Sequence, residues 1–410
     1  MTADFDIKYT DGGVCAPAGF RAAGTACGIK GVKDRKDLAL IVSDVMCSAA
    51  AVYTTNKVKG APLSVTRENI SDGRARAIIC NSGNANTCAP NGIEIAEKTC
   101  EITAANIGAD KKDIVVCSTG VIGQELSIEP FEAGIPELVA GLSSDGSKMA
   151  AEAIMTTDTV SKEISVEFTL GGKTCRIGGI AKGSGMINPA MATMLSFITT
   201  DAAISPEMLD RALKEDVKTS YNQICVDGDT STNDMTVVLA NGMAGNDMIE
   251  DEGEELEVFR AALAKVTVYL AKKLARDGEG ATKLIECRVE GAPDDEQARI
   301  ISKSVIASDL LKAAMFGADA NWGRVLCAIG YAPGDFSTDD IDVEMESAKG
   351  NVLVCRASRH EAYSEEKASE ILSEEEIIIK VDMHQGSGSA VAWGCDLTYD
   401  YVQINGDYRS

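Results

Sequence analysis

Short apolar runs alternate with amphipathic stretches along the whole chain. Apolar and β-branched runs predict strands at 37–44, 49–55, 75–80, 112–117, 162–170, 173–180, 283–289, 341–346, 352–356 and 376–383. Apolar positions three and four residues apart predict helices at 91–107, 145–154, 257–276, 294–316 and 364–372, and a further one after Ser205. Because strands and helices are mixed from one end to the other, the pattern predicts an α/β layered sandwich of mixed sheets.

Local signals mark the ends of several of these elements. Ser205 is a suitable N-cap residue, and Pro206 and Glu207 suit the first turn of the helix that follows. Gly171 and Gly172 separate two strands and predict a hairpin turn. Gly278 is expected to cap the helix 257–276 at its C-terminal end.

Composition and charge narrow the class of protein. The 410 residues suffice for two domains or one large layered unit, and 45% apolar with 25% charged residues is typical of soluble globular proteins. The net charge of −24, from 39 basic and 63 acidic residues, argues against a nucleic-acid partner. The start of the sequence has no signal pattern, and no apolar run approaches membrane-spanning length. We therefore expect a cytoplasmic protein without a membrane partner.

The metal-ligating residue types are scattered. The chain has 13 cysteines without a C-x-x-C pair, and its two histidines are His360 and His384. This spacing predicts no zinc site of the usual kind, and no metal is expected. Cysteines in apolar runs, such as Cys117, Cys287 and Cys327, are expected to be buried thiols of a protein in a reducing compartment.

The stretch 181–205, AKGSGMINPAMATMLSFITTDAAIS, has the most distinctive pattern. Gly183 and Gly185 permit unusual backbone angles, and an apolar run follows Thr193. One interpretation is a tight turn into a buried strand. The other is self-cleavage, in which the Thr193 hydroxyl attacks the carbonyl of Ala192. The new terminal threonine would then carry both a nucleophile and a base, its own α-amine.

Several shorter stretches carry weaker signals. The amide-rich run 81–86 reads as a loop or as one wall of a polar pocket, and 118–123 reads as a plain turn or as an oxyanion hole. The run 225–234 resembles a calcium loop but lacks its ligand spacing and closing glutamate. The glycines after the strand 376–383 lack the spacing of a dinucleotide site. Glu279 follows a helix C-terminus, where an acid is either solvent-exposed or handles protons.

The sequence KGSGMINPAMATMLSFITTDA resembles the processing site of the ornithine acetyltransferase family, also called the glutamate N-acetyltransferase family. The likeness extends over nearly the whole chain and includes the motif D-G-E-G-A-T-K at Asp277 to Lys283 and the stretch 317–324, expected to be a turn. It implies cleavage between Ala192 and Thr193 into fragments 1–192 and 193–410. The two fragments are expected to stay together and to assemble as an α2β2 heterotetramer.

The resemblance also implies a reaction and a site. Thr193 would carry the acetyl group from N-acetylornithine to glutamate as an acetyl-threonine intermediate, with Thr119 and Gly120 as the oxyanion hole. Glu279 would handle protons, and Lys182 would offer a cation to a substrate carboxylate. The implied substrate-binding residues are Thr156, Lys182, Thr193, Glu279, Asn405 and Ser410. The family uses no cofactor, although acetyl-CoA remains open as a second acetyl donor.

Two other functions remain open from the residues alone. A self-processed aminopeptidase or amidase would use the same terminal nucleophile, and a binding protein would keep the Thr193 loop uncleaved. The last ten residues read as a frayed tail, but the resemblance implies that Asn405 and Ser410 reach the substrate. Burial of Tyr401, Val402 and Ile404 would hold the tail in that position.

Overall fold

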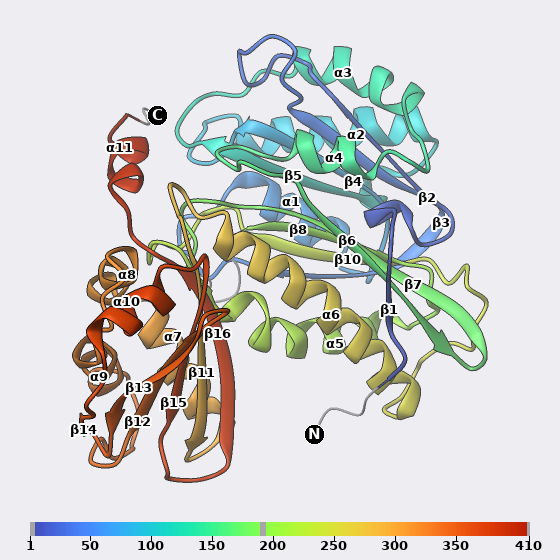
Figure 1. Ribbon diagram of the computed structural model, residues 1–410. Helices are drawn as coiled ribbons and strands as arrows, with labels where there is room; N and C mark the ends of the chain where they lie inside the picture. The colour runs from blue at the N-terminus through green and yellow to red at the C-terminus, as the bar shows by residue number, and fades with distance from the viewer. Residues whose placement is uncertain (1–4, 189–193, 408–410) are drawn as a thin grey trace.

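The computed structural model describes residues 5–188 and 194–407, which form two β-sheets with helices packed on them (Figure 1). The first sheet has nine strands in the order β1-β6-β7-β8-β10-β3-β4-β5, with β2 paired to β3. Its strands are β1 Lys8–Thr10, β2 Phe20–Thr25, β3 Leu38–Tyr53, β4 Arg74–Asn84, β5 Ile114–Val121, β6 Lys162–Leu170, β7 Lys173–Lys182, β8 Leu195–Thr200 and β10 Met235–Ala240.

The second sheet has seven strands in the order β14-β13-β12-β15-β11-β16-β9. They are β9 Ile224–Cys225, β11 Leu284–Ala292, β12 Asp342–Ser347, β13 Gly350–Arg356, β14 Arg359–His360, β15 Glu376–Asp382 and β16 Gly388–Cys395. The helices are α1 Ala61–Asn69, α2 Gly92–Ile107, α3 Glu129–Ala140, α4 Ser147–Ala153, α5 Pro206–Thr219, α6 Glu254–Arg276, α7 Asp295–Ile306, α8 Asp309–Phe316, α9 Trp322–Gly330, α10 Glu365–Leu372 and α11 Tyr399–Asp407.

The first sheet folds into two layers that face each other. The long strand β3 pairs with β4 through Leu38–Val42 and with β10 through Ser48–Tyr53, and its register with β4 shifts between Val42 and Cys47. One apolar core lies between the layers and contains Ile78 and Val115 on one side and Phe197 and Val237 on the other. The strand that was expected as two pieces, 37–44 and 49–55, is therefore one continuous strand that belongs to both layers.

Helices cover the outer face of each layer. Helices α2 and α3 pack on β4 and β5 through Ile95 and Ile135, and α5 and α6 pack on the opposite layer through Leu213 and Val266. Figure 1 shows these helix pairs at the top and bottom of the first sheet. The resulting order of helices, strands, strands and helices confirms the predicted layered α/β sandwich.

Helices α7 to α10 cover the second sheet and share one apolar core with it (Figure 1). The stretch 294–316 was expected as a single helix, but it forms α7 and α8, because Ser308 caps a new helix by accepting a hydrogen bond from Leu311 N. The expected turn at 317–324 is also wrong in its second half, since α9 begins at Trp322 with Asn321 as its cap.

Other element ends differ less. Ser205 caps α5 as predicted, accepting a hydrogen bond from Met208 N at 3.2 Å. Helix α6 ends at Arg276 with Asp277 at the cap position, so Gly278 is not the left-handed cap that was expected. A Cβ on Gly278 would lie 2.7 Å from Cys395 Sγ, so this glycine permits close packing instead.

The predicted cleavage point lies between two strands of the first sheet. Strand β7 precedes it and β8 follows it, and β8 lies between β7 and β10. Both sides of residues 192–193 thus contribute interleaved strands to one sheet. None of the helices in the described part of the chain is long and apolar enough to cross a bilayer.

Candidate active site

The C-terminal end of β5 carries Thr119 and Gly120. Gly120 has a φ of +132°, and a Cβ there would lie 2.3 Å from the carbonyl carbon of Gly83. Only glycine fits this approach to the neighbouring strand β4. Strand β4 itself runs through Asn84, so the amide-rich run that begins at Asn81 is largely strand and not loop.

Lys182 joins the two layers at this end of the sandwich. It is the last residue of β7, it is buried, and its Nζ lies 3.4 Å from the Thr119 hydroxyl. Thr119 lies on β5 of one layer and Lys182 on β7 of the other, so the hydroxyl, the Gly120 backbone and an ammonium group meet at one place.

A buried charge network lies beside Lys182. The fully buried Lys162 ammonium lies 2.7 Å from Asp158 Oδ1 and 2.5 Å from Asp277 Oδ2. Burial alone would raise the pKa of Asp158, but the charges of Lys182 and Lys162 lower it to about 2. Asp158 is therefore an ionised carboxylate that balances positive charge inside the site. We did not predict Asp158 or Lys162, because each resembles an ordinary surface charge in the sequence.

The Asp158 carboxylate also holds two separate backbone segments. Its Oδ1 accepts a hydrogen bond from Gly183 N at 2.6 Å, and its Oδ2 accepts one from Thr156 N at 3.0 Å. The carbonyl of Thr156 accepts a further hydrogen bond from Arg35. Thr156 is thereby tied to the start of the glycine-rich loop.

The glycine-rich loop packs on the turn after α6. Ser184 Oγ donates a hydrogen bond to the Asp277 carbonyl at 2.6 Å, and Glu279 N donates one to the Ser184 carbonyl at 3.1 Å. A Cβ on Gly185 would lie 2.5 Å from the Glu279 carboxyl carbon. Gly185 is therefore needed so that the Glu279 carboxylate can approach the loop backbone.

The calcium-like run 225–234 holds the other side of the same loop. Asp227 accepts hydrogen bonds from Met186 N at 2.6 Å and Ile187 N at 2.9 Å. Thr230 Oγ1 donates a hydrogen bond to the Asn188 carbonyl at 3.0 Å. The Asp227 carboxylate is engaged by backbone N–H groups, so this run positions the loop that leads to residue 189.

The last helix, α11, reaches the site through Asn405. Asn405 Nδ2 lies 2.8 Å from Glu279 Oε2, and Thr398 Oγ1 donates a hydrogen bond to the Gly280 carbonyl at 2.7 Å. The expected burial of Tyr401, Val402 and Ile404 is wrong. Tyr401 is half-buried, whereas Val402 is 68% exposed and Ile404 37% exposed, because α11 is held by polar contacts near its ends.

The predicted site residues that the structure describes thus lie in one connected region. Thr119, beside Gly120, contacts Lys182. Asp158 links Thr156 to the glycine-rich loop. Glu279 is hydrogen-bonded to Ser184 of that loop and to Asn405. Three predicted residues, Ala192, Thr193 and Ser410, lie outside the described residues.

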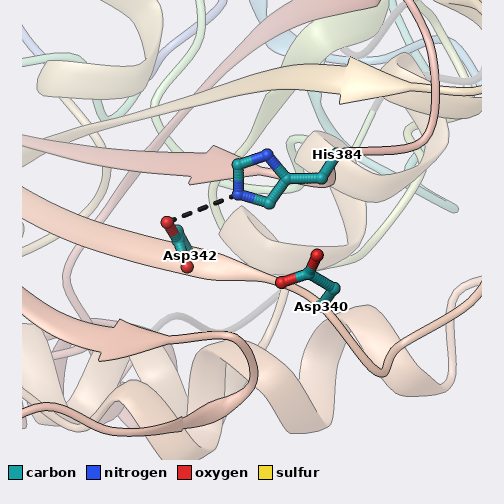
Figure 2. A group of neighbouring side chains, drawn as sticks. All are labelled: Asp340, Asp342 and His384. Carbon is teal, nitrogen blue, oxygen red and sulfur yellow. Dashed lines mark ion pairs between the residues drawn. The ribbon is translucent and has the colours of Figure 1, made fainter.

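A separate polar group lies on the second sheet (Figure 2). Asp340, Asp342 and His384 each offer one ligand atom, and these atoms lie within 4.8 Å of one another. His384 Nε2 lies 3.3 Å from Asp342 Oδ2, and its Nδ1 lies 3.4 Å from Asp382 Oδ1. The small burial of the ring lowers the pKa of His384, but the carboxylates around it outweigh this and raise it. The ring and these carboxylates attract each other when His384 is protonated, and this attraction favours the close grouping of the three side chains.

The cysteines are mostly buried thiols. All 13 are free, and Cys117 and Cys287 are buried as expected. Cys327 is exposed, so the expectation of a buried thiol there was wrong. Burial raises the pKa of Cys80 to about 12, although Lys182 and Lys30 act to lower it, and this thiol is unsuited to act as a nucleophile.

Comparison with known proteins gives a consistent result. The ArgJ family profile matches residues 21–410. The arginine biosynthesis bifunctional protein ArgJ of Caldanaerobacter subterraneus subsp. tengcongensis is 48% identical over 405 residues, which cover 98% of this chain and all of that protein. The protein of the same name from Symbiobacterium thermophilum is 49% identical over 406 residues, which cover 98% of this chain and all of that protein. The crystal structure of the Bacillus halodurans argJ protein matches 53% of this chain and all of that chain, with 47% identity and a TM-score of 0.50.

Proposed function

The chain belongs to the ArgJ family, and we propose a mechanism in which the site at the end of β5 and β7 carries out its acetyl transfer. The protein is an acetyltransferase of arginine biosynthesis that moves the acetyl group of N-acetylornithine to glutamate, giving ornithine and N-acetylglutamate. The observation that carries the mechanism is the meeting of Thr119, Gly120 and Lys182 beside the loop that leads to residue 193. An aminopeptidase or amidase activity with the same nucleophile is the less supported function.

Self-cleavage between Ala192 and Thr193 would prepare the enzyme. The Thr193 hydroxyl attacks the Ala192 carbonyl, and breakage of the peptide C–N bond gives an ester and frees the α-amine of Thr193. Water then hydrolyses the ester, which separates the two fragments and restores the Thr193 hydroxyl. The interleaving of β8 between β7 and β10 supports continued association of fragments 1–192 and 193–410 after the break. Separating them would expose the apolar core on both sides of β8.

Acetyl transfer then follows ping-pong chemistry. Thr193 Oγ attacks the acetyl carbonyl of N-acetylornithine while the α-amine takes the hydroxyl proton, and ornithine leaves. Glutamate attacks the acetyl-threonine by the reverse steps. The Gly120 N–H and the Thr119 hydroxyl stabilise the oxyanion of each tetrahedral intermediate, where preorganised donors are most effective.

The charged groups suit the two ends of an amino-acid substrate. The Lys182 ammonium is placed to bind the α-carboxylate of the substrate. The Asp158 carboxylate, which the Lys182 charge stabilises, accepts hydrogen bonds from Thr156 N and Gly183 N and so holds Thr156 in the same region. Glu279 lies against Gly185 of the glycine-rich loop and contacts Asn405, and its carboxylate can pair with an amino group or move a proton. Ser410 would complete this side of the pocket. In this mechanism the chain needs no metal or cofactor.

Three further expectations belong to the same proposal. The cleaved protein assembles as an α2β2 heterotetramer. It works in the cytoplasm, an assignment that its free thiols support, since disulfides are rare in reducing compartments. Acetyl-CoA serves as a second acetyl donor, in keeping with the word bifunctional in the names of the relatives.

An assay with separate donors and acceptors tests the function. N-acetylornithine with glutamate should give ornithine and N-acetylglutamate in equal amounts, and acetyl-CoA in place of N-acetylornithine tests the second donor. Ornithine released at the same rate with and without glutamate would favour an amidase and contradict the transferase mechanism.

A further inference from the structure

The loop between β2 and β3 is basic, although the chain as a whole is acidic. Residues 28–36, which we call the basic loop, contain four basic residues and one acidic residue, whereas the whole chain has 39 basic and 63 acidic residues. The four cations are Lys30, Lys33, Arg35 and Lys36. The transfer of an acetyl group from N-acetylornithine gives this local excess of positive charge no role.

A buried carboxylate holds the base of the basic loop. Asp37 Oδ1 accepts a hydrogen bond from Cys27 N at 2.7 Å, and its Oδ2 accepts one from Gly28 N at 3.0 Å and one from Lys30 N at 3.1 Å. The carbonyl of Asp37 accepts a further hydrogen bond from Ser82 N of β4 at 2.8 Å. The basic loop is therefore anchored to β4 at a defined place.

This place borders the candidate active site. A Cβ on Gly83 would lie 2.8 Å from Lys30 Cγ, and Gly83 pairs with Gly120 across β4 and β5. Only the backbone of Gly83 thus separates Lys30 from Gly120 of the proposed oxyanion hole. Further along the loop, Arg35 donates a hydrogen bond to the carbonyl of Thr156. The basic loop therefore lies beside both Gly120 and Thr156.

Most of the positive charge of the basic loop is not balanced by ion pairs. Lys36 pairs with Glu152 at 2.7 Å. Lys30 and Arg35 instead donate hydrogen bonds to neutral backbone carbonyls, and the exposed Lys33 side chain has no hydrogen bond or ion pair in the part of the chain that the structure describes. Burial lowers the pKa of Lys30 to about 8, and repulsion by Arg35 acts in the same direction. A polyanion bound here would relieve this repulsion.

We propose that Lys30, Lys33 and Arg35 bind the phosphate groups of acetyl-CoA, the second acetyl donor of the proposed function, on which this inference rests. Lysine and arginine form strong charge-assisted hydrogen bonds with phosphate. N-acetylornithine is small and carries no phosphate, whereas acetyl-CoA carries its phosphates at the far end of a long pantetheine arm. Cations at the border of the site therefore serve the larger donor.

Acetyl-CoA donates its acetyl group to the same nucleophile. The Thr193 oxygen forms a bond to the acetyl carbon, the carbon–sulfur bond breaks, and the thiol of coenzyme A leaves with the proton that the Thr193 hydroxyl gave to the α-amine. The basic loop takes no part in these bonds. It holds the nucleotide end of the donor, so it affects the KM for acetyl-CoA and not the chemical step.

Lys33→Glu is the informative variant, because Lys33 is exposed and its substitution leaves the contacts of Lys30 and Arg35 in place. We expect its KM for acetyl-CoA to rise about tenfold, as for a charge reversal at the rim of a binding site, while cleavage and the KM for N-acetylornithine stay within about twofold of the unmodified enzyme. Lys173→Glu, at an exposed lysine at the opposite end of β7 from Lys182, changes the net charge equally and should leave both KM values unchanged.

A donor without phosphate separates phosphate binding from other effects. S-acetylpantetheine carries the acetyl thioester and the pantetheine arm but no phosphate, so its KM should be the same in Lys33→Glu and in the unmodified enzyme. Salt screens exposed charges, so added sodium chloride should raise the KM for acetyl-CoA but not that for S-acetylpantetheine. Calorimetric binding of acetyl-CoA to the two glutamate variants gives the comparison without turnover.

Two kinetic results would overturn this inference. One is an equal KM for acetyl-CoA in Lys33→Glu and Lys173→Glu, and the other is a rise of the same size in the KM for S-acetylpantetheine. An unmodified enzyme that transfers from N-acetylornithine but neither uses acetyl-CoA nor binds it would also overturn the inference and leave the main reaction intact. Use of acetyl-CoA that depends on Lys33, without any transfer from N-acetylornithine, would support the inference and contradict that main reaction.

Discussion

The Lys162 ammonium lies 2.7 Å from Asp158 Oδ1, and both side chains are fully buried. Asp277 contacts the same ammonium, so one cation pairs with two carboxylates. Asp158 accepts hydrogen bonds from Thr156 N and Gly183 N, and Asp277 accepts one from Thr159 N. The strand β6 and the turn after α6 are far apart in the sequence, and this contact joins them beneath the site. The geometry of the loop that begins at Gly183 therefore depends on this buried charge network.

Lys162→Met should destabilise the protein strongly. The substitution leaves Asp158 and Asp277 buried without their shared cation, and breaking a buried pair in this way costs about 3–5 kcal/mol. Chemical denaturation at pH 7 measures the change. Lys173→Met, at an exposed lysine on the adjacent strand β7, is the matched control and should change stability by less than about 0.5 kcal/mol. Equal stability of the two variants would contradict the structural role of the network.

Thr119→Val should lower kcat about 10²–10³-fold, the usual effect of removing one oxyanion-hole donor. Thr119→Ser keeps a hydroxyl at nearly the same position and should retain most of the activity. Steady-state kinetics on fully cleaved protein gives both values. If the valine variant keeps the kcat of the serine variant, the Thr119 hydroxyl has no part in catalysis.

Asn405→Ala should raise the KM for N-acetylornithine about tenfold, because Glu279 loses the amide that orients its carboxylate, and a tenfold change corresponds to about 1.4 kcal/mol. Cleavage at Thr193 should be unaffected, since α11 lies outside the first sheet. Gln403→Ala, at an exposed position of the same helix, is the control. A KM unchanged in Asn405→Ala would show that α11 does not contribute to substrate binding.

Asp216 on α5 should make the protein less stable as the pH rises. Burial raises the pKa of Asp216 to about 7, although the hydroxyls of Thr267 and Ser220 lower it. A folded-state pKa above the unfolded one means that the stability is full below pH 4 and is lost as the pH rises toward 7. Asp216→Asn should therefore be more stable than the unmodified protein at pH 8, by at most about 4 kcal/mol, but not at pH 4. Parallel shifts in Tm at both pH values would contradict this.

The sequence predicted the layers, most strands and the helix after Ser205, because these depend on local periodicity and capping. It missed the strand β16 at Gly388–Cys395, where glycines and exposed positions conceal the alternation. Trp322 was placed in a turn because the cap residue Asn321 also suits a turn. The burial expected for Val402 failed, since three apolar residues near a chain end do not determine which face of a helix is covered.

In the candidate site, too, some residues could be predicted from the sequence and others could not. Thr119, Gly120, Lys182 and Glu279 were found through motifs that resemble a known family. Asp158 and Lys162 were missed, because a buried ion pair between residues four apart looks like a solvated pair in the sequence. The burial of Asp234, at the end of the run 225–234, was missed as well, because a run of hydroxyl and acidic residues gives no sign of burial. Tertiary packing alone decides which of these charges lose contact with water.

The acetyl-threonine intermediate provides the most direct test of the central claim. The purified protein is incubated with N-acetylornithine in the absence of glutamate, denatured, and its fragments are weighed by mass spectrometry. We predict two fragments, the second beginning at Thr193 and carrying one acetyl group on the threonine, with one ornithine released per acetylated fragment. Glutamate added before denaturation should remove the acetyl group. A single uncleaved chain that transfers acetyl groups, or a cleaved one that turns over without an acetylated Thr193, would contradict the account.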